Sequence, residues 1–259
     1  MSSTVCLTAN TFYYPEGGGH LWVYLNWALG FKALGFKVVW LEGVVQSTPP
    51  QEIDRLAACL KSSLKPYGLD ESVALCGWDG EELSSSEAQA VLSLEDAATA
   101  DILIDPGYHF SEKVVNRFRR SVLIDIDPGL LQIWLSQGEI ELARHDCYFT
   151  IGETVGRPDS RFPDAGYEWH YTPPCVSLES WPIVGAPADS PFTTVSHWNE
   201  KGLWIEFGDE LYDNNKRQGF MPYLPLPRRT SQRLELALAL VPGAEDSDRR
   251  MLEENGWST

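Results

Sequence analysis

The feature of this sequence best suited to ligand binding is a run of three glycines and a histidine, Gly17, Gly18, Gly19 and His20. The run follows a short apolar stretch, residues 4–10, and leads into residues 20–34, which predict a helix. Glycine tolerates positive φ and lets a ligand approach the backbone, and a helix N-terminus offers unpaired N–H groups. We therefore expect a ligand-binding turn here, with a simple chain reversal as the alternative. Its spacing matches neither the dinucleotide motif G-x-G-x-x-G nor a P-loop.

His20 is the first candidate for catalysis. It would open the predicted helix at the ligand-binding end of the sheet, and the ordinary pKa of an imidazole lies close to neutrality. A neutral ring at that position can accept a proton from a substrate hydroxyl. The alternative is a histidine that only packs at the start of the helix.

Acidic side chains close several predicted strands. Asp105 and Asp127 each precede Pro-Gly, which turns the chain sharply, and Glu153 follows the run CYFTI. Ligands bind at the carboxyl ends of strands in open parallel sheets, so Asp105 is expected to orient the catalytic histidine. Asp127, Glu153 and His109 are expected to contact the ligand. The equal alternative is an Asp-Pro turn whose carboxylate caps the next helix. Asp125, Asp127 and His109 would permit a metal, but no spacing requires one, and none is expected.

Four aromatic side chains near these segments offer rings on which a sugar can stack: Tyr108, Trp134, Trp169 and Trp198. The chain holds 10 tryptophans, but an aromatic side chain more often fills the core than serves as a platform. Stacking is therefore the secondary interpretation of these residues.

Apolar, strand-like runs alternate with helical patterns through most of the chain. Strands are expected over residues 4–10, 36–41, 73–76, 101–105, 121–127 and 147–151. Helices are expected over residues 20–34, 51–64, 86–98, 112–120 and 130–138. This alternation predicts an α/β fold with a Rossmann-like, doubly wound parallel sheet.

Three regions are expected along the chain. Residues 1–175 form the Rossmann-like domain, residues 176–191 are rich in proline and typical of a linker, and residues 192–259 form a partial second segment. Strands over 192–195 and 234–240 and helices over 209–218 and 247–255 are expected in that segment. These elements are too few to close an independent α/β domain.

The composition indicates which partners the protein can bind and in which cellular compartment it is expected. The net charge of −17 and the pI near 4.6 disfavour nucleic acid and anionic membranes, although backbone N–H groups can still bind a phosphorylated ligand. The five cysteines lack C-x-x-C spacing, which favours reduced thiols in the cytosol. No signal-peptide pattern is visible, and the most apolar segment, residues 21–34, is too short to span a bilayer. We expect a cytoplasmic protein without a transmembrane segment.

The order of these segments resembles the GT-B glycosyltransferases, in particular a bacterial group of that fold. The stretch YYPEGGGHLWVYLNWALGFKALGFKVVWLE, residues 13–42, is similar to the glycine-rich turn, long helix and second strand with which they open. SVLIDIDPGLLQIW, CYFTIGE, a proline-rich linker and FTTVSHW follow in the same order. The resemblance covers residues 5–198 as the N-terminal, acceptor-side domain and, more loosely, the start of a C-terminal domain up to residue 259.

The resemblance implies two Rossmann-like domains facing each other across a cleft, a nucleotide-sugar donor, an acceptor hydroxyl and no cofactor. Some inverting members carry a base histidine just after the first strand. His20 matches it by position, and Asp105 is a candidate for the aspartate that orients it. GT-B enzymes bind the donor nucleotide mainly through the C-terminal domain, and this sequence reaches residue 259 without that segment. The resemblance therefore implies a truncated chain, a partner subunit or homo-oligomer, or loss of transfer.

The function expected from the sequence is transfer of a sugar from a nucleotide-sugar to an acceptor hydroxyl, provided that a donor-binding domain is supplied. One alternative is a non-catalytic binding or assembly protein of the same ancestry. Another is an oxidoreductase that uses a dinucleotide. Glu42 ends the second predicted strand, where a ribose-binding acid belongs, but G-x-G-x-x-G is absent.

Overall fold

The computed structural model describes the whole chain except residues 1–2, 15–17, 84–90, 200–203, 214 and 241–245. The chain divides into two compact units, Met1–Pro182 and Ile183–Thr259. The division falls within residues 176–191, the range expected to be a linker. Each unit is described by itself below.

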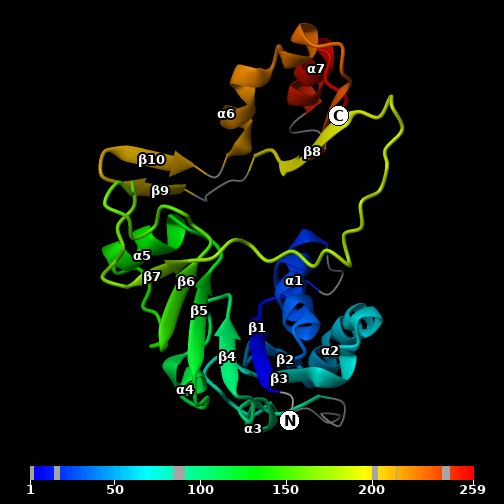
Figure 1. Ribbon diagram of the computed structural model, residues 1–259. Coiled ribbons are helices and arrows are strands. Elements are labelled where there is room, and N and C mark those ends of the chain that lie inside the picture. The colour runs from blue at the N-terminus through cyan, green and yellow to red at the C-terminus, as the bar shows by residue number, and fades with distance from the viewer. Residues whose placement is uncertain (1–2, 15–17, 84–90, 200–203, 214, 241–245) are drawn as a thin grey trace. The chain divides into compact units, whose positions relative to one another are not determined.

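The first unit is built on a seven-stranded sheet in the order β3-β2-β1-β4-β5-β6-β7, in which every neighbouring pair is parallel (Figure 1). The strands are β1 Thr4–Ala9, β2 Lys37–Val44, β3 Val73–Gly77, β4 Ile102–Asp105, β5 Ser121–Asp125, β6 Cys147–Thr150 and β7 Trp169–Tyr171. The order reverses between β1 and β4, which makes that point the switch at which such sheets bind ligands. The predicted Rossmann-like parallel sheet is confirmed.

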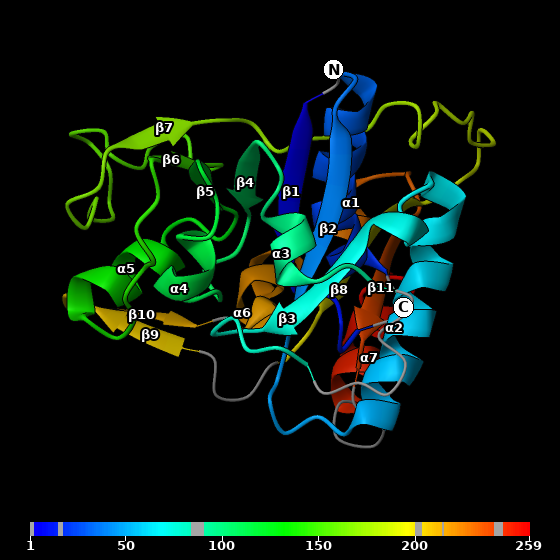
Figure 2. The same ribbon diagram turned by 90° about the horizontal axis from the view of Figure 1, so that it is seen from below.

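Helices flank the sheet (Figure 2). They are α1 Gly19–Ala33, α2 Pro50–Leu64, α3 Leu94–Ala97, α4 Glu112–Val115 and α5 Leu130–Gln137, with short 3₁₀ turns at Lys65–Tyr67 and Asp70–Ser72. Alternate residues of β1 point to opposite faces. Leu7 packs with Leu25 of α1 and Leu60 of α2, whereas Cys6 packs with Leu94 of α3 and with residues of α4. The sheet is therefore buried on both faces, which explains its nearly continuous apolar strands.

Some elements of this unit differ from expectation. The helix expected over 112–120 ends at Val115, because the chain then turns to bury Phe118 and to enter β5. Of the helix expected over 86–98, residues 86–90 lie outside the described residues, and the described part contains only α3, which begins with a capping box at Ser93. The sequence pattern missed β7, which is three residues long.

A short segment after β7 lies along α1 and is held by Asn26. The Asn26 side-chain oxygen accepts hydrogen bonds from the Ser177 N–H at 2.9 Å and the Trp181 indole N–H at 3.3 Å. Cys175 donates to the Asn26 carbonyl at 3.3 Å. Gly30 makes this approach possible, since a Cβ there would lie 2.8 Å from the Cys175 sulfur. Part of the expected linker is therefore bound to the first unit.

The second unit pairs β8 Phe192–His197 with β11 Leu234–Ala239 in parallel, and β9 Trp204–Phe207 with β10 Glu210–Asp213 in an antiparallel hairpin. Helices α6 Lys216–Phe220 and α7 Asp246–Glu254 and 3₁₀ turns Met221–Tyr223 and Leu226–Arg229 complete it. The helix expected over 209–218 is wrong. Gly208, at φ 62°, allows the tight turn that makes residues 210–213 a strand, and the helix begins only at Lys216. Within the described ranges, none of the helices has the length and apolar character needed to cross a membrane.

Candidate functional site

Asn10, the residue directly after β1, joins two histidines at the switch point of the sheet. The His20 Nε2 donates to the Asn10 carbonyl at 2.5 Å. The Asn10 amide donates to the His109 Nε2 at 3.2 Å. One residue therefore fixes the orientation of an imidazole from the start of α1 and of another from the loop after β4. The sequence predicted both histidines, but it gave no signal for Asn10.

The glycine run leaves the start of α1 open. Gly18 adopts φ 75°, which favours glycine, and Gly19 is the first residue of the helix. A Cβ at either position would meet no atom within 4 Å, so packing does not require a glycine at either one. Among the residues that the structure describes, no side chain caps this end of α1. The first backbone N–H groups of α1 are thus accessible to a ligand. Gly17 lies outside the described residues.

His20 has the geometry of a general base. Its ring is exposed and lies between Tyr14 and Tyr24, with ring centroids 5.6 and 5.5 Å away. Because Nε2 donates to a carbonyl, the neutral ring carries its proton there and has a lone pair on Nδ1. That nitrogen is the one that would accept a proton from a bound hydroxyl.

The surroundings of His109 favour its neutral form. Its ring contacts Trp78 and Tyr108, with centroids 5.6 and 5.0 Å away. Part of the ring reaches the surface, but loss of water around the rest lowers the pKa of His109. The charge of Asp105 opposes this shift, and the charge of His20 adds to it. The bond from Asn10 requires a lone pair on Nε2, which places the proton on Nδ1. His109 is thus a hydrogen-bond donor toward any ligand beside it.

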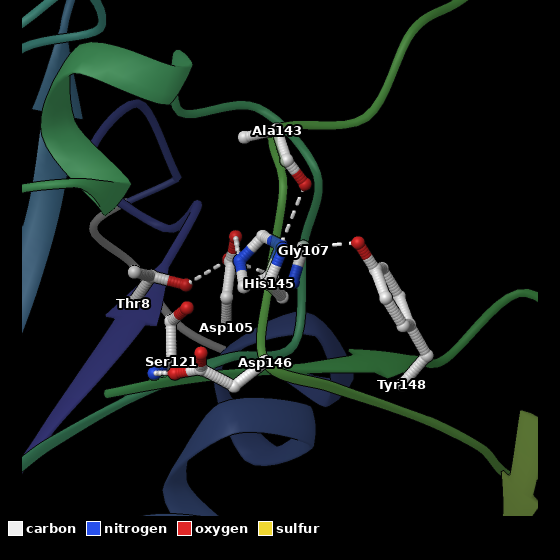
Figure 3. A network of polar contacts seen from close by, with 8 residues as sticks. All are labelled: Thr8, Asp105, Gly107, Ser121, Ala143, His145, Asp146 and Tyr148. Carbon is white, nitrogen blue, oxygen red and sulfur yellow. Dashed lines mark hydrogen bonds and ion pairs between the residues drawn. The ribbon is translucent and has the colours of Figure 1, made fainter. Parts of the chain in front are cut away.

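Asp105 lines the same crevice as His109 and belongs to a buried network (Figure 3). Its Oδ1 accepts hydrogen bonds from the Thr8 hydroxyl and, at 3.3 Å, from the Gly107 N–H. Its Oδ2 lies 3.3 Å from the Nε2 of His145, and both side chains are 1% exposed. The structure shows no contact between Asp105 and His20. The predicted orienting role of Asp105 therefore has no direct contact to support it.

His145 is the partner that the sequence did not reveal. Its Nδ1 donates to the Ala143 carbonyl at 2.8 Å, and its backbone N–H donates to the Tyr148 hydroxyl at 2.9 Å (Figure 3). With Nδ1 bound to a carbonyl, the Nε2 of His145 faces the Asp105 carboxylate. The contact lies within ion-pair distance but lacks hydrogen-bond alignment. It is a buried imidazole–carboxylate contact whose members are far apart in sequence.

Two further predicted ligand contacts, Asp127 and Glu153, lie on the same edge of the sheet but farther along it. Asp127 follows β5 and is exposed. Burial raises the pKa of Tyr108 to about 12, and the nearby charge of Asp127 contributes to this shift. Glu153 follows β6, is exposed and lies 3.6 Å from Arg157. Since parallel strands are about 4.8 Å apart, Glu153 is roughly 10 Å from the line of β4. The structure does not bring it beside the histidines.

Asp125 has a structural role at this edge. It is buried, and it accepts hydrogen bonds from the Asp127 N–H at 2.9 Å and from Gln132 and Thr150 at 2.7 Å each. Burial raises the pKa of Asp125, and these bonds oppose the shift. The network fixes the Asp-Pro-Gly turn onto the start of α5. The Asp125 carboxylate is therefore engaged in hydrogen bonds within the protein and is not available to a ligand.

The aromatic candidates divide between core and surface. Trp198 is fully buried in the second unit and Trp169 is buried beside Leu131, so the stacking interpretation is wrong for both. Trp134 and Tyr108 are half-buried, and Tyr108 lies against His109. The described residues contain no group of three or more His, Cys, Asp or Glu side chains suited to a metal ion.

Glu42 cannot bind a ribose as the oxidoreductase alternative required. It is fully buried at the end of β2. Its carboxylate accepts hydrogen bonds from the backbone N–H groups of Thr11 and Phe12, from the Thr11 hydroxyl and from the Trp40 indole N–H. The carboxylate thus ties the chain after β1 to β2, and it is not available to a ligand.

The buried Glu42 gives a pH-dependent prediction. Burial raises the pKa of Glu42 above its ordinary 4.5, although the hydrogen bonds act in the opposite direction. The folded state then binds the proton more tightly than the unfolded state. The stabilising contribution is therefore complete below pH 4.5 and is lost as the pH rises from 4.5 through the native value. We expect the free energy of unfolding of the wild type, minus that of Glu42→Gln, to decrease as the pH rises across that window. Urea denaturation at stepped pH measures it, and a difference that grows with pH contradicts it.

Two cavities adjoin the histidines. The crevice between the ends of β1 and β4 has no space for even a water molecule, since it is filled by side chains that include Tyr24, Trp78 and His109. A groove of about 340 Å³ lies on the other side of His109. Ligand pockets typically measure about 300–1,000 Å³, so a ligand has room in the groove and over the crevice, but not inside the crevice.

Fold and site together define a Rossmann-like α/β protein with a pair of imidazoles at the switch point of its sheet. A scan against protein-family models finds no match for the chain, and no curated protein matches it in sequence.

Proposed function

We propose that this chain is the acceptor-side part of a GT-B-like glycosyltransferase, which moves a sugar from a nucleotide-sugar to an acceptor hydroxyl. The observation that carries the proposal is the exposed His20 ring, anchored through Nε2 at the switch point with Nδ1 free of the anchoring bond. The open start of α1 beside it supports the proposal, because its N–H groups suit an anionic diphosphate.

In the proposed reaction the His20 Nδ1 takes the proton of the acceptor hydroxyl. The acceptor oxygen forms a bond to the anomeric carbon of the donor sugar. The bond between that carbon and the diphosphate oxygen breaks, and its electron pair leaves with the nucleoside diphosphate. Catalysis depends on holding acceptor and donor in line. In the proposal the start of α1 contacts the donor diphosphate, and a second nucleotide-binding domain or a partner subunit adds contacts to the nucleoside, in a protein that acts in the cytoplasm.

A non-catalytic binding or assembly protein is the second candidate. The filled crevice between β1 and β4 favours it, because it leaves no room for a ligand at the switch point itself. Such a protein would use the same edge of the sheet to hold a partner rather than to transform a substrate.

Donor binding and turnover separate the two candidates. The chain is titrated by calorimetry with UDP-glucose and GDP-mannose, and release of UDP or GDP is followed over time. A transferase is expected to bind one of these donors and to release its nucleotide slowly by hydrolysis when no acceptor is present. Absence of both binding heat and release for every UDP- and GDP-sugar tried would favour the assembly protein and reject the transferase.

A further inference from the structure

The groove beside His109 is lined by side chains that are absent from the proposed chemistry. It lies where β3, β4 and the segment before β6 meet, and it encloses about 340 Å³. Its principal lining residues are Trp78, Asp79, Tyr108, His109, Glu112 and Glu141. This volume falls within the range of natural ligand pockets and fits a small ring compound.

The charge of the groove is negative and uncompensated. Asp79, Glu112 and Glu141 are exposed carboxylates, and the described residues form no ion pair with any of them. No lysine or arginine is among the residues that the structure places along the groove. Three like charges at one site attract a cation and repel an anion. The whole chain, at −17, reinforces the same preference.

The aromatic side of the groove is rigid. Trp78 packs on Phe110, with ring centroids 4.9 Å apart, and lies over Gly43, where a Cβ would be 2.2 Å from the indole ring. Tyr108 lies against His109 at 5.0 Å. Fixed aromatic rings bind the apolar face of a sugar ring, and they attract an ammonium group.

A hydroxyl in the groove lacks a partner. The Ser111 Oγ is shielded from solvent, and within the described residues it makes no hydrogen bond. A polar group left in that state carries a free-energy cost. The groove therefore offers acceptors, a donor and aromatic surface together.

The groove reaches the imidazole pair. His109 lines both the groove and the crevice that contains Asn10, and Asn10 contacts His20. A ligand seated in the groove would therefore lie beside His109 and close to the start of α1.

We propose that this groove binds a ring compound that carries hydroxyl groups and a protonated amine, the chemistry of an amino sugar. Its role as the acceptor site rests on the transferase proposed above, but the binding itself does not. The carboxylates bind the ammonium group, Trp78 and Tyr108 contact the ring, and His109 donates to a hydroxyl. A phosphorylated acceptor is excluded by the charge.

Binding is tested with three probes that differ in charge. Glucosamine, glucose and glucose 6-phosphate are titrated at pH about 6.5, where an amine remains protonated. The indole N–H signal of Trp78 is followed by NMR after assignment with Trp78→Phe. Glucosamine is expected to bind most tightly, glucose more weakly and glucose 6-phosphate not at all. Equal binding of glucose and glucosamine, preference for the phosphate, or no shift with any probe overturns the proposal.

A charge variant adds a matched comparison. The triple variant Asp79→Asn, Glu112→Gln, Glu141→Gln keeps side-chain size and is expected to weaken glucosamine binding about tenfold, with little effect on glucose. The control triple variant Glu52→Gln, Glu71→Gln, Glu168→Gln removes three surface carboxylates outside the groove and is expected to leave binding unchanged. Equal weakening in both variants would show that only net charge acts, which also rejects the proposal.

Failure of this inference is distinguishable from failure of the proposed function. If glucosamine binds in the groove but no nucleotide-sugar is turned over, the proposed binding site is supported and the proposed transferase activity is rejected. If nucleotide-sugar is turned over but glucosamine neither binds nor accelerates release, the transferase stands and the groove assignment fails.

Discussion

Replacing His145 with alanine is expected to lower the free energy of unfolding by about 3–5 kcal/mol, because it removes the imidazole that faces the buried Asp105 carboxylate and leaves that carboxylate unpaired. Asp105 and His145 are each 1% exposed, and their facing atoms lie 3.3 Å apart. The hydrogen bonds from Thr8 and Gly107 would remain, but they do not neutralise the charge. Urea denaturation at neutral pH measures the loss.

The matched control is His170→Ala, an exposed ring on β7, whose loss is expected to be far smaller. A second background isolates the contact between the two side chains. In Asp105→Asn the charge is absent, so His145→Ala is expected to cost clearly less there than in the wild type. If the cost is the same in both backgrounds, the histidine stabilises the fold by packing and not by pairing with Asp105.

Replacing His20 with alanine is expected to reduce nucleotide-sugar turnover by about 10²–10⁴-fold, the usual contribution of a general base. The fold is expected to be unchanged, because the ring is exposed and does not cap α1. Nucleotide release measures the first effect, and thermal unfolding measures the second. His20→Asn, whose amide can still donate to the Asn10 carbonyl, is expected to be as inactive as alanine because it has no base.

The same assay applied to His170→Ala is expected to give wild-type turnover, since that ring lies on β7, at the edge of the sheet. Unchanged turnover in His20→Ala would remove this residue from the mechanism. A loss of turnover accompanied by a lower melting temperature would instead assign His20 a role in stability.

Most of the first unit could be predicted, because local pattern is enough to identify long buried elements. Residues 4–10 and 36–41 are mostly apolar runs, and both form strands close to the expected bounds. The hairpin of residues 204–213 could not be predicted in the same way. Its strands are four residues each and exposed in part, so the pattern over 209–218 resembled a polar helix. The three residues of β7 are too short for any periodicity to appear.

The candidate site was predictable only in part. The rule that parallel sheets bind ligands at their carboxyl ends led to His20 and His109, and both contact Asn10. The same rule selected Glu153, which lies two strands away from β4. Strand order decides which loop ends become neighbours, and the sequence pattern predicts strands without their order. The groove beside Trp78 depends on that order as well.

The sequence by itself determined the α/β alternation, the acidic character and the glycine-rich entry to α1, because these follow from composition and short-range periodicity. Only the tertiary structure decided that Asp105 is buried against His145, and that Glu42 is occupied by Thr11 and Trp40. Thr8 and Asp105 are 97 residues apart, and their contact exists only because β1 and β4 are adjacent in the sheet. Side-chain environments of this kind arise from the packing of distant segments, which no local pattern encodes.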